Sequence, residues 1–167
     1  MPSVRISKEA NESIYFLTFT VRNWYYVLDR YNRWDILADS LKFFQDNKCL
    51  KIFGYVFMTN HIHLLIQSPD AMGFVRDFKK FTARKILENI QKTEPSIMKL
   101  FSMENGTHEF WNKTNMPELI ESDRFFAQKL NYIHDNPVRR DYVEKQEYWH
   151  WSSANSNGKI IISSVYN

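Results

Sequence analysis

The chain has 167 residues, of which 44% are hydrophobic and 25% charged, with only four glycines and five prolines. The length predicts a single domain over residues 1–167, whose tail from about residue 155 could be peripheral, and the composition excludes a disordered or low-complexity chain. Lysine and arginine number 22 against 19 acidic residues, so the net charge of +3 is too small to identify a nucleic-acid-binding protein by itself.

Cysteine usage and the absence of long apolar runs indicate the cellular environment. The only cysteine, Cys49, rules out an internal disulfide and a cysteine-based zinc site. No apolar run approaches the roughly 20 residues of a membrane span, and the N-terminus lacks a signal-peptide pattern. We therefore expect a cytoplasmic protein with no membrane partner.

The first part of the chain combines three β-rich runs with one helix. Residues 14–21 are dense in β-forming side chains, and residues 51–58 and 61–67 form two more such runs. Thr59 and Asn60 join the latter two, a connection short enough for an antiparallel hairpin. Residues 33–47 repeat apolar side chains every three or four positions, which predicts a helix.

The second part is predicted to contain two helices separated by an irregular stretch. Residues 71–92 have helical apolar spacing and no internal proline. Residues 93–121 show little periodicity, although 108–111 could form a short strand that closes the sheet. Ser122 is a plausible N-cap for a helix to about residue 135, which Asn136 and Pro137 should end. This order predicts an α+β fold, an antiparallel sheet covered by helices.

Two histidines stand out in the third β-rich run. His61 and His63 are separated by one residue, and because strand side chains alternate, both imidazoles should point to the same face. Two converging imidazole nitrogens make half of a metal site. By itself, such a pair is more often two surface or hydrogen-bonded histidines without any ligand.

A second group of polar residues lies in the last predicted helix. Lys129, Tyr132 and Asn136 follow one another at spacings of three and four, so a cation, a phenol and an amide would project from one face. From spacing alone, Tyr132 could instead be an amphipathic side chain at the margin of the core, with Asn136 merely ending the helix.

Four ordered motifs together resemble a known family. They are VFMTNHIHLL at 56–65, FVRDFKKFT at 74–82, YIHDNPVR at 132–139 and WSS at 151–153. With similar separations, these motifs resemble the REP-associated tyrosine transposases, which belong to the single-tyrosine transposases of the HUH (His-hydrophobic-His) superfamily. The resemblance covers about residues 14–154, and the set is far more specific than any one motif.

The resemblance implies a ferredoxin-like α+β fold and an enzyme that cleaves and rejoins single-stranded or hairpin DNA at palindromic elements. His61 and His63 would hold a divalent metal ion, Mg²⁺ or Mn²⁺, and Tyr132 would be the nucleophile that forms a 5′-phosphotyrosine. Asn136 would be the third metal-side residue, with His134, Asp135 and Glu121 as alternatives. Some relatives pair the tyrosine and histidine motifs across a homodimer and others within one chain, and the sequence leaves both arrangements open.

Positive charge is concentrated where such a protein could contact DNA. Residues 71–92 carry six basic and two acidic residues, whereas 94–123 carry two basic and six acidic. Arg76, Lys80 and Arg84 recur every four residues and would form a stripe suited to phosphates, although a solvated helix face would look the same. The cations that we expect to contact DNA are Arg76, Lys79, Lys80, Arg84, Lys129, Arg139 and Arg140.

Two other functions remain open from the sequence. The first is a non-catalytic DNA-binding or regulatory protein derived from a transposase. The second is a two-histidine metal hydrolase that activates water, which would leave the Tyr132 motif without a role. The joint presence of His61, His63 and Tyr132 favours the transposase. Trp149 and Trp151 are interpreted as packing residues.

Overall fold

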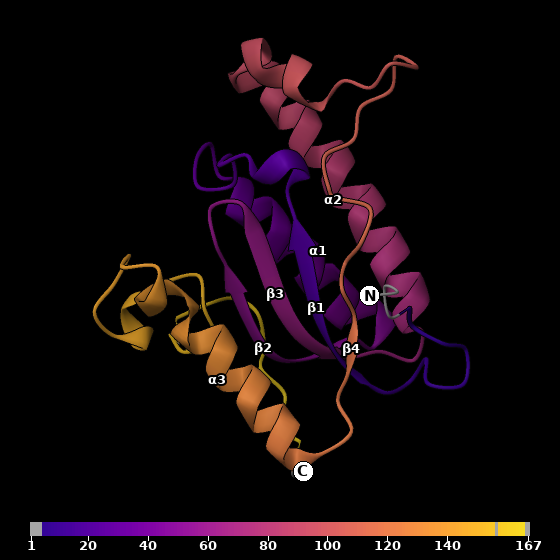
Figure 1. Cartoon of the computed structure of the whole chain (residues 1–167), viewed down its shortest axis with the longest axis vertical. Helices are drawn as coiled ribbons and strands as arrows, with labels where there is room; N and C mark the ends of the chain where they lie inside the picture. The colour runs from indigo at the N-terminus through magenta and orange to yellow at the C-terminus, as the bar shows by residue number, and fades with distance from the viewer. Residues whose placement is uncertain (1–4, 156, 166–167) are drawn as a thin grey trace.

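The computed structural model describes residues 5–155 and 157–165, and within them it contains one four-stranded sheet with helices on both faces (Figure 1). The strands are β1 (Ile14–Thr20), β2 (Lys51–Phe57), β3 (His61–Gln67) and β4 (Glu118–Leu119). The α-helices are α1 (Arg33–Lys48), α2 (Ala71–Thr93) and α3 (Asp123–Arg139), and the 3-10 helices are η1 (Arg22–Trp24), η2 (Pro95–Phe101) and η3 (Gln146–Tyr148).

The strand order is β2-β3-β1-β4, and each neighbouring pair is antiparallel. Because β3 lies between β1 and β2, the connection through α1 crosses over one strand, and the connection through α2 returns the chain to the other edge. This is the ferredoxin-like topology that the resemblance implied. The predicted α+β class with an antiparallel sheet is confirmed.

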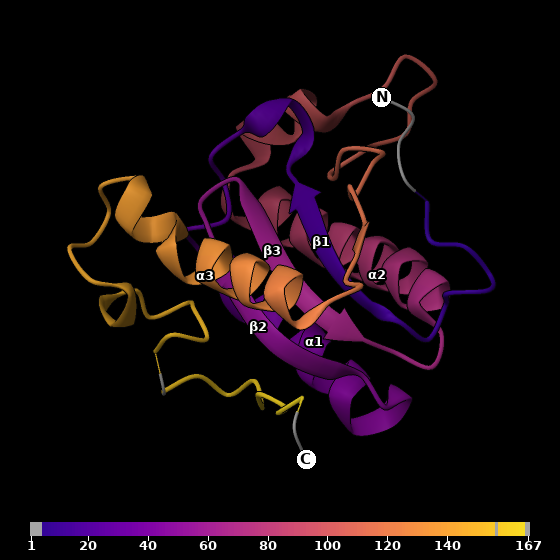
Figure 2. The same cartoon turned by 60° about the horizontal axis from the view of Figure 1, so that its bottom comes forward.

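The two faces of the sheet carry different helices, as Figure 2 shows: α1 and α2 cover one face and α3 covers the other. Side chains of β3 alternate accordingly. Ile62, Leu64 and Ile66 belong to the large core beneath α1 and α2. Leu65 belongs to a smaller core with Ile133 of α3. The odd-numbered residues of β3, including both histidines, therefore face α3.

Glycine lets α3 approach the sheet closely. A Cβ atom at Gly54 of β2 would lie 2.5 Å from Leu130 Cδ1, a separation that real Cβ atoms do not adopt. The N-terminus of α3 is capped as predicted, because Ser122 Oγ accepts a hydrogen bond from the Phe125 amide at 3.1 Å. The close approach at Gly54 places α3 against β2, and the serine cap marks where the helix begins.

The end of α3 differs from the sequence prediction. The helix does not stop before Asn136 but continues through Pro137 to Arg139. Proline removes one backbone donor, yet the helix continues past it and its last turn closes where the Arg140 amide donates to Asn136 O at 3.1 Å. Asn136 and Pro137 are both buried, so packing against the sheet outweighs the local preference to end the helix.

The fourth strand is also placed differently. Residues 108–111 were predicted to close the sheet, but they form only isolated bridges, Val21 with Trp111 and Ser102 with His108. The edge strand is instead Glu118–Leu119, which pairs with Tyr15 and Phe16 of β1. Two paired residues carry too little pattern to be recognised in a sequence.

The C-terminal segment follows the exposed edge of β2. Trp151 O accepts from the Phe57 amide at 2.8 Å, and the Ser153 and Ser163 amides donate to Tyr55 O and Ile52 O. Backbone groups that an edge strand would expose are thus paired. Trp149 and Trp151 serve packing: Trp149 Nε1 donates to Phe57 O and the Trp151 ring stacks on Phe57. In the described ranges, no helix has the length and apolarity to cross a membrane.

Candidate active site

The two histidines of β3 lie side by side on the face that α3 covers. Their rings are 4.8 Å apart between centroids, and the side chains are only 4% and 5% exposed. In the β1–β3 register, Thr20 is opposite His61 and Thr18 is opposite His63. The expectation that both imidazoles share a face therefore agrees with the geometry.

Hydrogen bonds engage one nitrogen of each ring and leave the other available. His63 Nδ1 pairs with Thr18 Oγ1 at 2.9 Å, and His61 Nδ1 pairs with Asn60 Oδ1 at 2.7 Å. Asn60 is oriented by its amide nitrogen, which donates to Trp24 O at 3.3 Å. Because Asn60 Oδ1 can only accept, His61 Nδ1 carries the proton and His61 Nε2 has a free lone pair.

Burial keeps both histidines neutral near pH 7. Loss of hydration lowers the pKa of His61 to about 4, and the positive charge of Arg140 contributes in the same direction. Burial also lowers the pKa of His63 well below its ordinary value, assisted by His61, Lys129 and the arginines at the end of α3. Neutral imidazole is the form that binds a metal ion.

This burial predicts a pH dependence of folding. The folded pKa of His61 lies below the unfolded value of 6.5, so the unfolded chain binds the extra proton and stability falls as the pH decreases through this window. Between pH 7 and pH 5, His61 alone should lower the free energy of unfolding of the metal-free protein by about 2 kcal/mol. Urea unfolding at both pH values should show a smaller loss for His61→Leu. An equal loss in both proteins would contradict the shift.

Tyr132 of α3 lies directly against this pair. Its ring meets the His63 ring edge-on at 5.3 Å and 70°, and it meets Phe16 at 5.9 Å. The side chain is 38% exposed, so the phenol is within reach of a solvent-borne substrate. The arrangement brings a histidine of β3 and a tyrosine 69 positions later in the sequence into one cluster.

Two cations flank the Tyr132 ring. The Arg139 guanidinium lies 4.3 Å from the ring centroid, and Lys129 Nζ lies 5.6 Å away. Lys129 also pairs with Glu118 of β4 at 2.7 Å, and Arg139 pairs with Asp135 at 3.5 Å. The site therefore has a positive rim that is partly balanced by carboxylates.

Asn136 is the third polar group on this face. It is 2% exposed and follows Tyr132 by one helical turn. Arg140, whose charge lowers the pKa of His61, lies one further turn along the chain. Within residues 5–155 and 157–165, the buried side-chain atoms that lack a hydrogen-bond partner are Ser40 Oγ, His63 Nε2 and Asn136 Oδ1. His63 Nε2 belongs to the histidine pair, and Asn136 Oδ1 lies on α3 one turn after Tyr132.

The alternative third ligands have other partners or are exposed. His134 Nε2 is 2.7 Å from Ser153 Oγ, and Asp135 pairs with Arg139. Glu121 is exposed before the start of α3. Across the described part of the chain, no three His, Cys, Asp or Glu side chains are grouped to hold a metal ion.

The basic stripe of α2 does not join this site. Arg76, Lys80 and Arg84 are exposed on a helix that covers the opposite face of the sheet (Figure 2). Lys79 differs from them because its Nζ donates to Asn112 O and Lys113 O, at 2.8 and 2.9 Å, and burial lowers its pKa. Lys79 thus anchors the segment that leads to β4.

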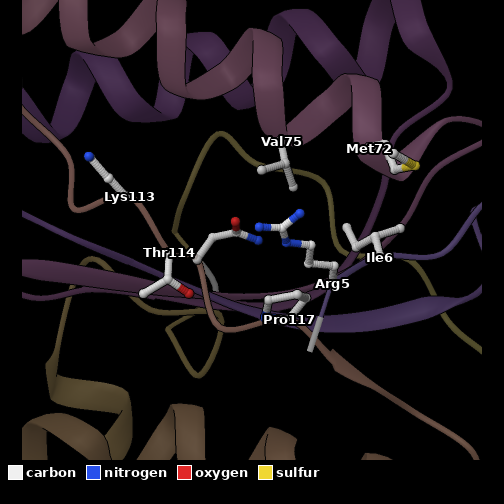
Figure 3. Close-up of a pocket in the computed structure, with 8 residues that line it drawn as sticks. Arg5, Ile6, Met72, Val75, Lys113, Thr114 and Pro117 are labelled. Atoms are coloured by element: carbon white, nitrogen blue, oxygen red, sulfur yellow. The ribbon is translucent and has the colours of Figure 1, made fainter. Parts of the chain in front are cut away.

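The pocket drawn in Figure 3 is also separate from the candidate site. It has a volume of about 380 Å³ between the N-terminal segment, α2 and residues 113–117. The Arg5 side chain extends between Val75 and Pro117. None of the lining residues belongs to the histidine–tyrosine cluster.

The structure adds three residues that sequence reasoning missed. Thr18 and Asn60 orient the two imidazoles, and Trp24 places its ring edge-on to His61 at 6.4 Å. Asn60 stands directly before His61 and within the motif, so its position offered a signal. Thr18 and Trp24 are both distant in sequence: the β1–β3 pairing brings Thr18 to the site, and the 3-10 helix that follows β1 brings Trp24.

The fold and the site together define the class of protein. The fold is ferredoxin-like, and its strand β3 carries His61 and His63 on the face where Tyr132 of α3 contacts His63. Residues 10–146 match the family model described as "Transposase IS200 like". The chain belongs to this family of transposases, and the resemblance inferred from its motifs is confirmed.

Two relatives show how close the similarity is. A Haemophilus influenzae protein described as a REP-associated tyrosine transposase is 29% identical over 117 residues, which cover 63% of this chain and 59% of that protein. The chain thus matches less than two thirds of that relative's length. The solved structure of a REP-associated tyrosine transposase bound to a REP hairpin has a TM-score of 0.69 at 18% identity, covering 98% of this chain and 100% of that chain. At this identity the likeness establishes a common fold.

Proposed function

We propose that this protein is a metal-dependent transposase that cleaves and rejoins single-stranded DNA at palindromic hairpin elements through a 5′-phosphotyrosine. The observation that carries the proposal is the contact between the Tyr132 ring and the His63 ring, beside the buried pair His61–His63. A nucleophile and two neutral metal ligands thereby share one partly open surface. The hairpin bound by the structural relative supports this class of substrate.

The side chains fit a divalent cation such as Mg²⁺ or Mn²⁺. The unpartnered His63 Nε2 and Asn136 Oδ1 are buried atoms that need a partner, and His61 Nε2 has a free lone pair. These three atoms would hold the ion. When bound, a divalent cation neutralises a non-bridging phosphate oxygen and polarises the phosphorus atom.

Tyr132 would supply the covalent chemistry. Its hydroxyl oxygen forms a bond to phosphorus and loses its proton, while the bond from phosphorus to the 3′ oxygen breaks and that oxygen leaves as a 3′-hydroxyl. The strand is then held as a 5′-phosphotyrosine ester. Attack by another 3′-hydroxyl reverses these changes and releases Tyr132, so rejoining requires no external energy source. Lys129, Arg139 and Arg140 would attract the phosphates that flank the reacting one.

The decisive experiment uses labelled single-stranded hairpin DNA from the sequences that flank the protein's own gene. With Mg²⁺ or Mn²⁺ present, a denaturing gel should show a covalent protein–DNA adduct. If the protein binds hairpin DNA but forms no adduct with any hairpin tested, the result would favour a non-catalytic DNA-binding protein. Cleavage without an adduct would favour a hydrolase that activates water.

A separate prediction concerns the stripe on α2. Replacing Arg76, Lys80 and Arg84 together by alanine should weaken DNA binding regardless of sequence. The slope of log affinity against log salt should decrease by up to about 0.7 per lost contact on single-stranded DNA. Fluorescence anisotropy at several salt concentrations measures both quantities. An unchanged slope would assign the stripe to solvent exposure alone. The control replaces three exposed lysines outside α2, Lys8, Lys48 and Lys145, by alanine.

A further inference from the structure

A large exposed aromatic side chain stands at the edge of the candidate active site. Trp24 is 55% exposed although tryptophan carries one of the largest apolar surfaces of any residue. Its ring is edge-on to the His61 ring at 6.4 Å. It lies in η1, directly after β1, at the same end of the sheet as the β2–β3 connection (Figure 1). One side of the site is therefore bordered by an exposed indole that is not packed in either hydrophobic core.

The backbone that presents Trp24 is strained. Asn23 and Trp24 have φ angles of 54° and 59°, in the left-handed region, which a bulky residue rarely adopts. Hydrogen bonds hold this conformation: the Trp24 amide donates to Val21 O at 2.9 Å, and the Asn60 side-chain amide donates to Trp24 O at 3.3 Å. Asn60 also holds His61, so one side chain positions both the indole and the imidazole. Strain that is stabilised in this way is typical of functional sites.

The chemistry of this surface favours a nucleobase. An exposed indole offers a flat π-face on which any base can stack, and single-strand binding proteins combine such faces with nearby positive charge. Arg139 and Arg140 provide that charge at the end of α3, the latter close enough to influence His61. Resting on the function proposed above, we propose that Trp24 stacks against a nucleobase of the DNA strand next to the scissile phosphate.

The test measures binding to fluorescein-labelled oligothymidylate of about 15 nucleotides in the Tyr132→Phe background, so that no covalent chemistry intervenes. Trp24→Ala should weaken binding about 5- to 150-fold, the range expected for loss of one stacked base. Trp24→Phe keeps an aromatic ring and should recover most of the affinity. On an oligonucleotide of the same length made of abasic sites, Trp24→Ala should change binding less than about twofold.

The control is Phe43→Ala on α1, whose side chain is similarly exposed at 53% on the opposite face of the sheet. It should bind both oligonucleotides as the Tyr132→Phe protein does. The inference would be overturned if Trp24→Ala bound oligothymidylate as tightly as the Tyr132→Phe parent. It would also be overturned if Trp24→Ala lost as much affinity for the abasic strand, or if Trp24→Phe bound as weakly as Trp24→Ala. Because binding is measured without cleavage, these outcomes are independent of whether the covalent adduct forms. Matching thermal unfolding of the variants excludes a folding defect as the cause.

Discussion

Replacing Tyr132 by phenylalanine is expected to abolish the covalent protein–DNA adduct, lowering its rate of formation by at least about 1,000-fold. The change removes one oxygen atom and keeps the ring, so the contacts with His63 and Phe16 remain. Folding and most of the DNA affinity should therefore be unchanged. Denaturing gels measure the adduct, and anisotropy with the same hairpin measures binding.

The matched control for this experiment is Tyr142→Phe. Tyr142 is 43% exposed, stacks on Trp149 and places its hydroxyl 3.4 Å from Thr59 Oγ1, close to the start of β3. It is thus an accessible phenol in the same region but without a described ring contact to either histidine. If Tyr142→Phe lost the adduct and Tyr132→Phe retained it, the nucleophile would be assigned to the wrong tyrosine.

The sequence predicted best the elements in which buried side chains recur at regular spacing over many residues. In β3, alternation predicted that His61 and His63 face away from Ile62 and Leu64, and the two cores show this separation. The long apolar stripe of α2 and the serine cap of α3 were predicted for the same reason: several local signals agreed.

The predictions failed where tertiary packing outweighs a local signal. Pro137 indicated a helix end, but burial of Asn136 and Pro137 carries α3 onward to Arg139. This extension keeps Asn136 inside the helix, one turn after Tyr132. Lys79 stays a predicted DNA contact, but its ammonium also donates to the distant carbonyl groups of residues 112 and 113, which the sequence did not indicate.

The orienting residues of the site could not be derived from the sequence. Thr18 contacts His63 across 45 positions, and Asn60 contacts Trp24 across 36. Such contacts depend on strand register, which a pattern of apolar residues restricts only to one face. One side chain, Asn60, pairs with His61 Nδ1 and also donates to Trp24 O.

The second large effect is expected from His63→Leu. This variant should lower the affinity for Mn²⁺ by at least about 100-fold, because even residues that only orient metal ligands contribute 10- to 100-fold. It should also remove the adduct. Electron paramagnetic resonance of free Mn²⁺ in a titration measures the first quantity without any DNA. His134→Leu is the control, because His134 bonds to Ser153 and should not affect Mn²⁺ binding.

The stability of the same variant separates a ligand from a structural histidine. In the metal-free protein, His63 Nε2 is buried without a hydrogen-bond partner, which lowers the free energy of unfolding by about 1–3 kcal/mol. The hydrogen bond between His63 and Thr18 raises it by about 1 kcal/mol. Without metal, the His63→Leu variant should therefore have the same free energy of unfolding as the wild type within about 1 kcal/mol, or a higher one. Saturating Mn²⁺ should stabilise the wild type and not the variant, since only the protein that binds the ion gains from it. A variant that is much less stable without metal, yet still stabilised by Mn²⁺, would show that His63 supports the fold and that other residues hold the ion.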